Sequence, residues 1–150
     1  MTDKPKIRAY KPSDKPALLE ILKLNIPVYF AESELDDLNE YLEHRVEMYF
    51  VAEIENKIVG AGGINFDGTT GKISWDFIHP EFRGKSIGQQ LLNYRIDLLK
   101  SMKNIKNVTV RTSQLAYKFY QKNGFTLKEV TKNYWAKGLD LYSMIYEHTI

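Results

Sequence analysis

The segment 75–92 constrains the fold of this chain most, because it predicts a strand, a tight turn and a helix in direct succession. Its sequence is W-D-F-I-H-P-E-F-R-G-K-S-I-G-Q-Q-L-L. Bulky side chains alternate on both faces between 73 and 78, as in a strand that is covered on both sides. Pro80 ends that strand, and apolar residues then recur at helical spacing. These are Ile87, Leu91, Leu92, Ile96, Leu98, Leu99 and Met102.

The turn within this segment, Arg83 to Gly88, has the composition of an anion-binding loop. Its glycines let a ligand approach the backbone, and the free N–H groups at the start of the following helix carry partial positive charge. Phosphate is the anion that such a loop most often binds. Lys85 adds a full charge beside it. Glycines that serve only to turn the chain are the alternative explanation.

Ser86 is the unusual residue of this loop. A left-handed backbone at Ser86 would cost about 1–2 kcal/mol more than at glycine, whereas a helix N-cap conformation would suit serine well. Both conformations remain open at this point.

Composition predicts a soluble α/β protein of one domain, residues 1–150, with a single core. The chain is 43% hydrophobic and 27% charged, with a formal net charge of +2. It has no cysteine, which excludes disulfides and thiolate catalysis. No apolar run approaches the roughly 20 residues of a membrane span. The N-terminus lacks the apolar segment of a secretion signal, so we expect a cytoplasmic protein.

The three histidines, His44, His79 and His148, do not have the spacing of metal ligands. We expect surface or structural roles for them, and no metal. Lys100, Lys103 and Lys106 gather at the end of the long helix. Aromatic residues do not interleave them, so a solvated helix end explains them better than a nucleic-acid patch.

Periodicity predicts the element order β-α-α-β-β-β-α-β-α-β-β. Strands are expected at 6–10, 49–54, 58–66, 72–78, 107–112, 125–134 and 139–146, and helices around 18–22, after Ser33, at 87–102 and at 115–122. This order predicts a mixed sheet of about seven strands with helices on both faces. In the second helix, Glu34, Asp37, Glu40 and Glu43 are expected to be mostly solvated. Gly60, Gly62 and Gly63 predict a bulge or a close approach by another group.

Two local motifs resemble those of the GCN5-related N-acetyltransferase (GNAT) family. The first, H-P-E-F-R-G-K-S-I-G-Q-Q-L-L, resembles the acyl-CoA-binding motif Q/R-x-x-G-x-G/A. Arg83 and Gly88 match it, and Ser86 stands where the family usually has glycine. The second, A-Y-K-F-Y-Q-K-N-G-F at 116–125, resembles A-x-x-x-Y-x-x-x-G-F. The element order is also that of the family, so the resemblance covers essentially the whole chain.

The resemblance implies that acetyl-CoA binds as cosubstrate, with its pyrophosphate on the amides of the Arg83–Gly88 loop and the first helical turn. The pantetheine arm would then lie like an extra strand beside residues 76–78, where unpaired backbone groups can bind its amides. The backbone N–H of Ile78 would bind the thioester oxygen. The implied cofactor contacts are Phe77, Ile78, Arg83, Gly84, Lys85, Ser86, Ile87, Gly88, Gln89 and Ser113. Ser113 would replace part of an asparagine contact, or would cap the short helix.

For the chemistry, the resemblance implies that Tyr120 protonates the leaving thiolate; the alternative is a tyrosine of the core. Relatives use a glutamate base on the central or following strand, or a water relay, and this chain has no glutamate on those strands. Asp76 is the only acid near the implied reaction centre. It is either the general base or a structural carboxylate.

The leading hypothesis is therefore an N-acetyltransferase that moves an acetyl group to a primary amine by direct attack in a ternary complex. The alternative is a non-catalytic acyl-CoA-binding or sensing domain, which the missing glutamate favours. Acidic residues in 29–37 hint at a cationic acceptor or are ordinary surface charge. A small amine, a peptide N-terminus and a lysine all stay open as acceptors. We expect no membrane or nucleic-acid partner, and aromatic residues on the last strands make a homodimer possible.

Overall fold

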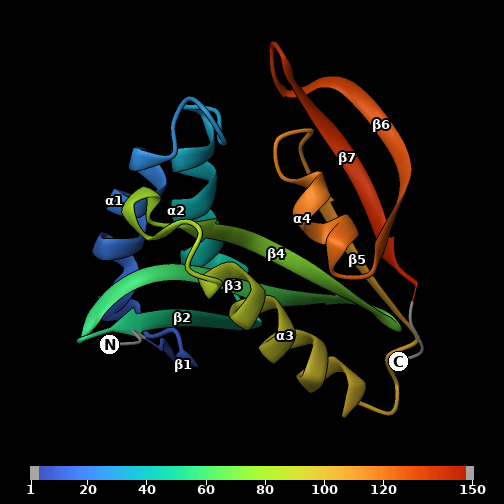
Figure 1. Cartoon of the computed structure of the whole chain (residues 1–150), viewed down its shortest axis with the longest axis horizontal. Coiled ribbons are helices and arrows are strands. Elements are labelled where there is room, and N and C mark those ends of the chain that lie inside the picture. The colour runs from blue at the N-terminus through green and yellow to red at the C-terminus, as the bar shows by residue number, and fades with distance from the viewer. Residues whose placement is uncertain (1–3, 148–150) are drawn as a thin grey trace.

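The computed structural model describes residues 4–147 (Figure 1). The strands are β1 Lys6–Ala9, β2 Met48–Ile54, β3 Lys57–Asp67, β4 Thr70–Ile78, β5 Asn107–Thr112, β6 Phe125–Ala136 and β7 Leu139–Tyr146. The helices are α1 Lys15–Leu24, α2 Glu34–His44, α3 Ile87–Lys100 and α4 Tyr117–Lys122, with short 3₁₀ turns at Pro12–Asp14 and Pro80–Phe82. The predicted element order is confirmed. His148 lies outside the described residues.

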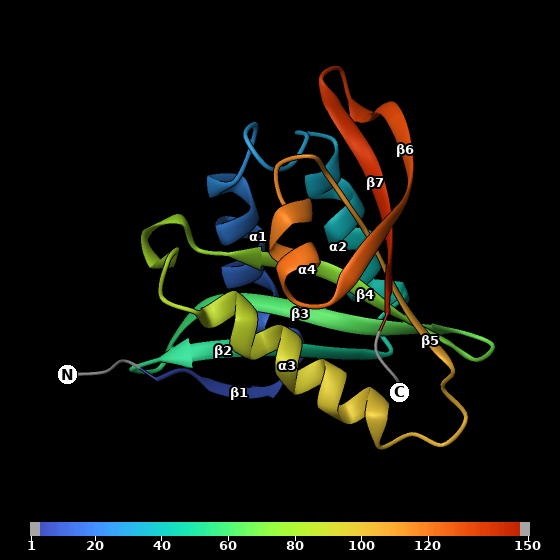
Figure 2. The ribbon, with the colours of Figure 1, turned by 45° about the vertical axis from the view of Figure 1, so that its right-hand side comes forward.

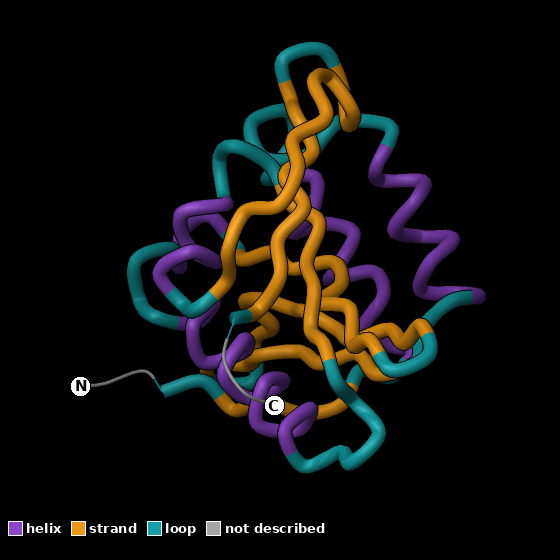
Figure 3. The backbone as a smooth tube through the Cα atoms, turned by 90° about the vertical axis from the view of Figure 1, so that its right-hand side faces the viewer, coloured by secondary structure: helices purple, strands orange, loops and turns teal. Residues whose placement is uncertain are grey.

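All seven strands form one sheet in the order β1-β2-β3-β4-β5-β7-β6. Helices α1 and α2 pack on one face of it, and α3 and α4 lie on the other (Figure 2); Figure 3 shows helices on both sides of the strands. Leu18, Leu22 and Leu38 fill the core under α1 and α2. Ile87, Leu91 and other apolar residues of α3 pack on the opposite face. The prediction of a mixed sheet with helices on both faces is therefore confirmed.

The sheet opens between its two halves. Every neighbouring pair of strands is antiparallel except β4 and β5, which are parallel and pair only from Thr70–Asn107 to Ile73–Val110. Beyond Ile73 the two strands diverge, and the remaining part of β4 has an open edge (Figure 1). A strand edge of this kind leaves backbone groups available to a ligand.

Two local expectations need correction. Glu34 is not solvated: it is 7% exposed, and its carboxylate accepts a hydrogen bond from the backbone N–H of Ala31 at 2.7 Å, just ahead of α2. Burial raises the pKa of Glu34, although that hydrogen bond opposes the rise. The short helix α4 begins at Tyr117 instead of Leu115, because the preceding residues form a turn around Ser113.

Candidate functional site

A bulge in β4 places the central side chain of the candidate site. Ala61 pairs with Phe77 and Gly63 pairs with Ser74, so β4 carries one residue more than β3 across this interval. Trp75 absorbs the extra residue with a left-handed backbone, φ 50°. Its carbonyl accepts a hydrogen bond from the Tyr49 hydroxyl at 2.8 Å. The bulge breaks the alternation of side chains and re-aims Asp76.

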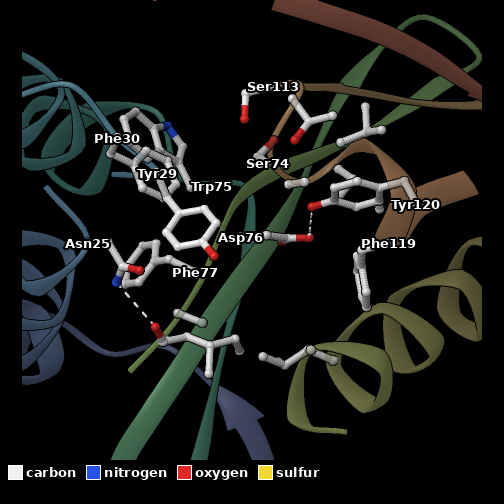
Figure 4. A pocket seen from close by; sticks show the side chains of 18 of the residues that line it. Asn25, Tyr29, Phe30, Ser74, Trp75, Asp76, Phe77, Ser113, Phe119 and Tyr120 are labelled. Atoms are coloured by element: carbon white, nitrogen blue, oxygen red, sulfur yellow. Dashed lines mark hydrogen bonds between the residues drawn. The ribbon is translucent and has the colours of Figure 1, made fainter. Parts of the chain in front are cut away.

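Asp76 joins α3 to α4 through its two carboxylate oxygens. Oδ1 is ion-paired with the guanidinium of Arg95 on α3, and Oδ2 accepts a hydrogen bond from the Tyr120 hydroxyl on α4 at 2.6 Å (Figure 4). The sequence prediction named Asp76 and Tyr120, and the structure brings the two side chains together. Asp76 is therefore a paired carboxylate, as the structural alternative anticipated, and it is also in contact with the candidate acid.

Sequence reasoning missed Arg95, which is 1% exposed. Its Nε donates to the Leu91 carbonyl and its Nη1 to the Gly63 carbonyl, each at 3.0 Å, so the guanidinium is fixed on three sides. The sequence does contain a pattern that indicates a buried arginine at this position. Arg95 interrupts the apolar stripe of α3, one helical turn after Leu91, and a cation at such a position needs a buried partner.

Gly62 makes room for this ion pair. A Cβ at Gly62 would lie 2.7 Å from Cζ of Arg95 and closer still to Oδ1 of Asp76. The predicted close approach at the glycine-rich part of β3 is thus made by the Arg95–Asp76 pair.

The electrostatics of the site keep Tyr120 protonated. Burial, with the nearby charge of Asp76, raises the pKa of Tyr120 well above its ordinary value. Burial is the largest single influence on Arg95 and lowers its pKa, but the charge and hydrogen bond of Asp76, with smaller contributions from Tyr120 and Tyr49, together raise the pKa of that guanidinium. The site therefore holds a fixed cation, a carboxylate and a neutral phenol in one hydrogen-bonded chain.

The loop ahead of α3, residues 83–88, has the geometry of an anion cradle. Gly84 and Ser86 both have a left-handed backbone, φ 76° and 64°. Ser86 makes no side-chain cap, which decides between the two conformations considered for it. Within the described residues, the backbone N–H groups from Gly84 to Gln89 have no acceptor, and the first helical bond is Gln90 N–H to Ser86 O at 3.1 Å. Six consecutive free amides fit the pyrophosphate of acetyl-CoA.

Arg83 is bound to the neighbouring α1–α2 loop. Its guanidinium lies 3.9 Å above the centre of the Tyr29 ring and donates a hydrogen bond to Oδ1 of Asn25. The Asn25 amide in turn donates to the Ile78 carbonyl at 3.2 Å (Figure 4). The loop between α1 and α2 is thus tied both to the cradle and to the open edge of β4.

Ile78 presents its backbone to the open edge. The N–H of the next residue, His79, donates to the Val59 carbonyl of β3 at 2.8 Å. Because successive residues of a strand direct their backbone groups to opposite sides, the N–H of Ile78 points away from β3. This is the orientation that binding of a thioester oxygen requires.

A cleft of about 920 Å³ connects these features. It runs from the cradle along the open edge of β4 and onto the face covered by α1 and α2. Aromatic side chains gather on one side of it, with Tyr120 and Phe119 on the other and Asp76 between them (Figure 4). Every predicted site residue except Lys85 lines this cleft. Ser113 also accepts the Leu115 N–H at 3.2 Å, so it shapes the turn before α4.

The described residues include no group of three or more His, Cys, Asp or Glu side chains that could hold a metal ion. His79 has a structural role, because its Nδ1 accepts the Glu81 N–H at 3.1 Å. None of the helices in residues 4–147 is both long and apolar enough to cross a membrane.

Comparison with known proteins agrees with this geometry. The family model described as "Acetyltransferase (GNAT) domain" matches residues 45–127, more than half of the chain. The match contains β2 to β5, the cradle, α3 and α4. The chain belongs to the GNAT family of acetyltransferases, and the resemblance noted in the sequence is confirmed.

Solved structures share the fold over nearly the full length. The ribosomal-protein-S18-alanine N-acetyltransferase of Escherichia coli has a TM-score of 0.81 at 15% identity, covering 98% of this chain and 96% of that one. A ribosomal-protein-alanine N-acetyltransferase of Brucella melitensis has a TM-score of 0.76 at 22% identity, covering 97% and 99%. Spermidine N-acetyltransferase of Vibrio cholerae, solved with CoA and spermine, has a TM-score of 0.70 at 20% identity, covering 94% of each chain.

Proposed function

We propose that this protein transfers an acetyl group from acetyl-CoA to a primary amine by direct attack in a ternary complex. The observation that carries the proposal is the continuity of the cleft. Free amides at the start of α3 lead along the open edge of β4 to the Asp76–Tyr120 pair. Membership of the GNAT family and the fold neighbours that act on amines support the same reaction.

The chain supplies binding and charge stabilisation. When bound, acetyl-CoA provides a thioester that is activated toward an amine. The amides of Gly84 to Gln89 and the side chain of Arg83 hold its phosphates, for which Arg83 leaves Tyr29 and Asn25. The N–H of Ile78 donates to the oxygen on which negative charge develops, an effect commonly worth about 100- to 1000-fold in rate.

We assign Asp76 as the proton acceptor and Tyr120 as the proton donor. The substrate ammonium first loses one proton to water. The amine nitrogen then bonds to the acetyl carbon, the C–S bond breaks, and the sulfur leaves with the electron pair. Asp76 takes the second proton from nitrogen, and Tyr120 gives its proton to sulfur. Return of the proton from Asp76 to Tyr120 restores the site.

The hydrogen bond between the two residues couples these transfers. Tyr120 has one hydroxyl proton, and while Asp76 is ionised that proton is held by its carboxylate. Once Asp76 is protonated, its O–H can donate to the Tyr120 oxygen, which frees the phenol proton to point at sulfur. Proton uptake from the amine therefore prepares the acid. This order compensates for the raised pKa of Tyr120, which by itself makes the phenol a weak acid.

A double-mutant cycle tests the coupling. Acetyl transfer is followed as thiol release, which gives no protein background because the chain has no cysteine. Tyr120→Phe and Asp76→Asn should each lower kcat by about 10- to 1000-fold. The double variant should be no slower than the slower single variant. The matched control is Tyr117→Phe on the same helix, whose ring packs against Tyr142 outside the cleft. Multiplied losses in the double variant would contradict the coupling.

A second candidate function is a non-catalytic acyl-CoA-binding domain, favoured by the fact that both Asp76 oxygens are already paired. Thermal unfolding with acetyl-CoA, CoA and adenosine separates the cases. A ligand at 100 times its Kd stabilises by about 2.7 kcal/mol, which raises Tm by several degrees. A rise with acetyl-CoA and CoA, but no thiol release with any amine, would establish the binding domain. No rise would remove the cofactor assignment itself.

A further inference from the structure

The acceptor half of the cleft has a floor of polar side chains from three neighbouring strands. We define the acceptor floor as Asn65, Lys72, Ser74, Thr109 and Arg111, all of which line the cleft. Asn65 pairs with Lys72, and Lys72 pairs with Thr109, so the row crosses β3, β4 and β5. The Tyr41 hydroxyl of α2 donates to Asn65, which places this row on the face covered by α1 and α2.

The floor carries cations that the protein does not neutralise well. Among residues 4–147, the one carboxylate that reaches Nζ of Lys72 is that of Asp67, at 4.0 Å, and the Lys72 and Asp67 side chains are 49% and 78% exposed. Within residues 4–147, Arg111 has no carboxylate partner. Its guanidinium instead lies over two rings of β6, 5.0 Å from the centre of Tyr134 and 5.7 Å from that of Trp135. A third cation, Arg45, lies at the end of α2, and its contact with Glu40 is long and exposed.

The carboxylates near the floor are already engaged. Asp76 binds Arg95 and Tyr120, and Glu34 is buried against the Ala31 N–H. Glu47 accepts from the Asn65 amide and from the Phe66 N–H, each at 3.0 Å. Of the acidic residues in 29–37, only Glu34 lines the cleft. The sequence hint of a cationic acceptor therefore loses its support, because the free charge of this half is positive.

We propose that the acceptor is an amine that also carries a carboxylate, bound by Arg111 and Lys72. This proposal rests on the acetyl transfer proposed above and names its substrate class. The amine reaches Asp76 at the open edge, and the carboxylate lies over the floor. Arg111 is suited to it, because a planar guanidinium binds a carboxylate through two parallel hydrogen bonds, and in this structure it lies over two aromatic rings instead of pairing with a protein carboxylate.

The distance between Arg111 and Asp76, and the side chains that line the cleft between them, agree with such a molecule. Val110 is the last residue of β5 to pair with β4, at Ile73, so Arg111 is about level with Ser74. Asp76 follows two residues later, and because Trp75 between them is not extended, the two positions are at most about 7 Å apart along the chain. Tyr29, Phe30 and Trp75 line the space beside this path, and Phe30 stacks on Trp75 with ring centres 6.2 Å apart. An apolar or aromatic body between the amine and the carboxylate would contact these rings.

The test compares acceptors that differ only in the carboxylate. The pair is 4-(aminomethyl)benzoate and benzylamine, which present the same benzylic amine, with thiol release as the readout. The carboxylated amine should have a kcat/KM about 10- to 100-fold higher, the range expected for charge-assisted hydrogen bonds to one carboxylate. L-Phenylalanine and phenethylamine form a second pair, which shows whether a carboxylate next to the amine is also accepted.

Variants of Arg111 and Lys72 test whether these two cations cause the preference for the carboxylated amine. Arg111→Gln should reduce the ratio of the two kcat/KM values about tenfold, and Arg111→Glu should reverse it. Lys72→Gln should also reduce this ratio, independently of Arg111. Lys23→Gln is the matched control, because Lys23 is an exposed cation on α1 that does not line the cleft. The melting temperature of each variant is measured to confirm that it is folded.

The outcomes separate this inference from the proposed function. Thiol release at equal rates with both members of each pair, or faster release with the amines that lack the carboxylate, would overturn the carboxylate and leave the N-acetyltransferase in place. Binding of acetyl-CoA without release from any amine would overturn both. A preference that survives Arg111→Glu and Lys72→Gln would also overturn the assignment to this floor.

Discussion

Replacing Gly62 by alanine would test the packing of the candidate site with a single methyl group. The added Cβ would lie 2.7 Å from Cζ of Arg95 and closer to Asp76; Arg95 is 1% exposed and has little room to move, whereas Asp76 lines the cleft. Inserting a methyl group into a packed core costs about 1–3 kcal/mol. Separation of a buried ion pair costs about 3–5 kcal/mol when one partner loses its counter-charge. Because the pair can shift without separating fully, we expect a loss of about 2–4 kcal/mol.

For a chain of this size, 1 kcal/mol corresponds to roughly 2–4 °C in Tm, so Gly62→Ala should lower Tm by about 5–15 °C. Thermal and urea unfolding without ligand measure this directly. The matched control is Gly88→Ala, whose Cβ would lie 3.5 Å from Phe119, an ordinary contact. Removing that glycine from the first turn of α3 should leave Tm unchanged or raise it. A Gly62→Ala protein that melts within about 2 °C of the parent would refute the packing described for Arg95 and Asp76.

Four further outcomes follow from the same structure. Gly88→Glu should abolish the rise of Tm with acetyl-CoA while the protein stays folded, because bulk and negative charge enter the cradle; retained binding would show that the phosphate site lies elsewhere. Asp76→Asn should lower kcat at every pH at which transfer is measured, and an unchanged kcat would mean that Asp76 does not accept the amine proton. Burial raises the pKa of Tyr41 to about 12 and those of Tyr49 and Tyr120 well above 10, so the unfolded chain loses these protons first as pH rises. Stability contributed by these tyrosines is therefore complete below about pH 10 and falls above it, by about 1.4 kcal/mol per pH unit for each tyrosine, which urea midpoints from pH 9 to 11.5 measure. Tyr49→Phe should make that fall shallower, and an equal slope would show that Tyr49 titrates normally.

The sequence predicted the fold well because most helices and strands can be recognised from patterns within short segments of the chain. The loop at Gly84 and Ser86 opens a helix whose apolar stripe is regular, and Asn123–Gly124 and Lys137–Gly138 place two later turns correctly. Strand β5 begins and ends at the residues predicted for it. These features depend on the backbone preferences of single residues and on the spacing of hydrophobic residues, both of which can be seen in short segments of sequence.

The candidate site was predicted only in part, because its geometry depends on contacts between distant segments. Asp76 and Tyr120 were named separately, but their hydrogen bond joins residues 44 positions apart. Arg95 was not named in the sequence analysis, although it is among the most buried side chains of the described chain. Glu34 was predicted to be solvated; its hydrogen-bond partner, the Ala31 N–H, is only three residues away, but the burial of Glu34 depends on the folded structure around it. A sequence shows which residues are charged, but it does not show which residue each charge is paired with.

The left-handed backbone of Trp75 limits how far this protein can be stabilised. A bulky residue in that conformation costs about 1–2 kcal/mol, which the aromatic packing on Phe30 and the hydrogen bond from Tyr49 offset. Trp75→Gly would relax the backbone but remove the ring that lines the cleft. A screen for variants with a higher Tm should therefore find stabilising substitutions in the two cores but none at Trp75 that keeps activity. The strained backbone at Trp75 turns Asp76 toward Tyr120 and is part of the candidate site.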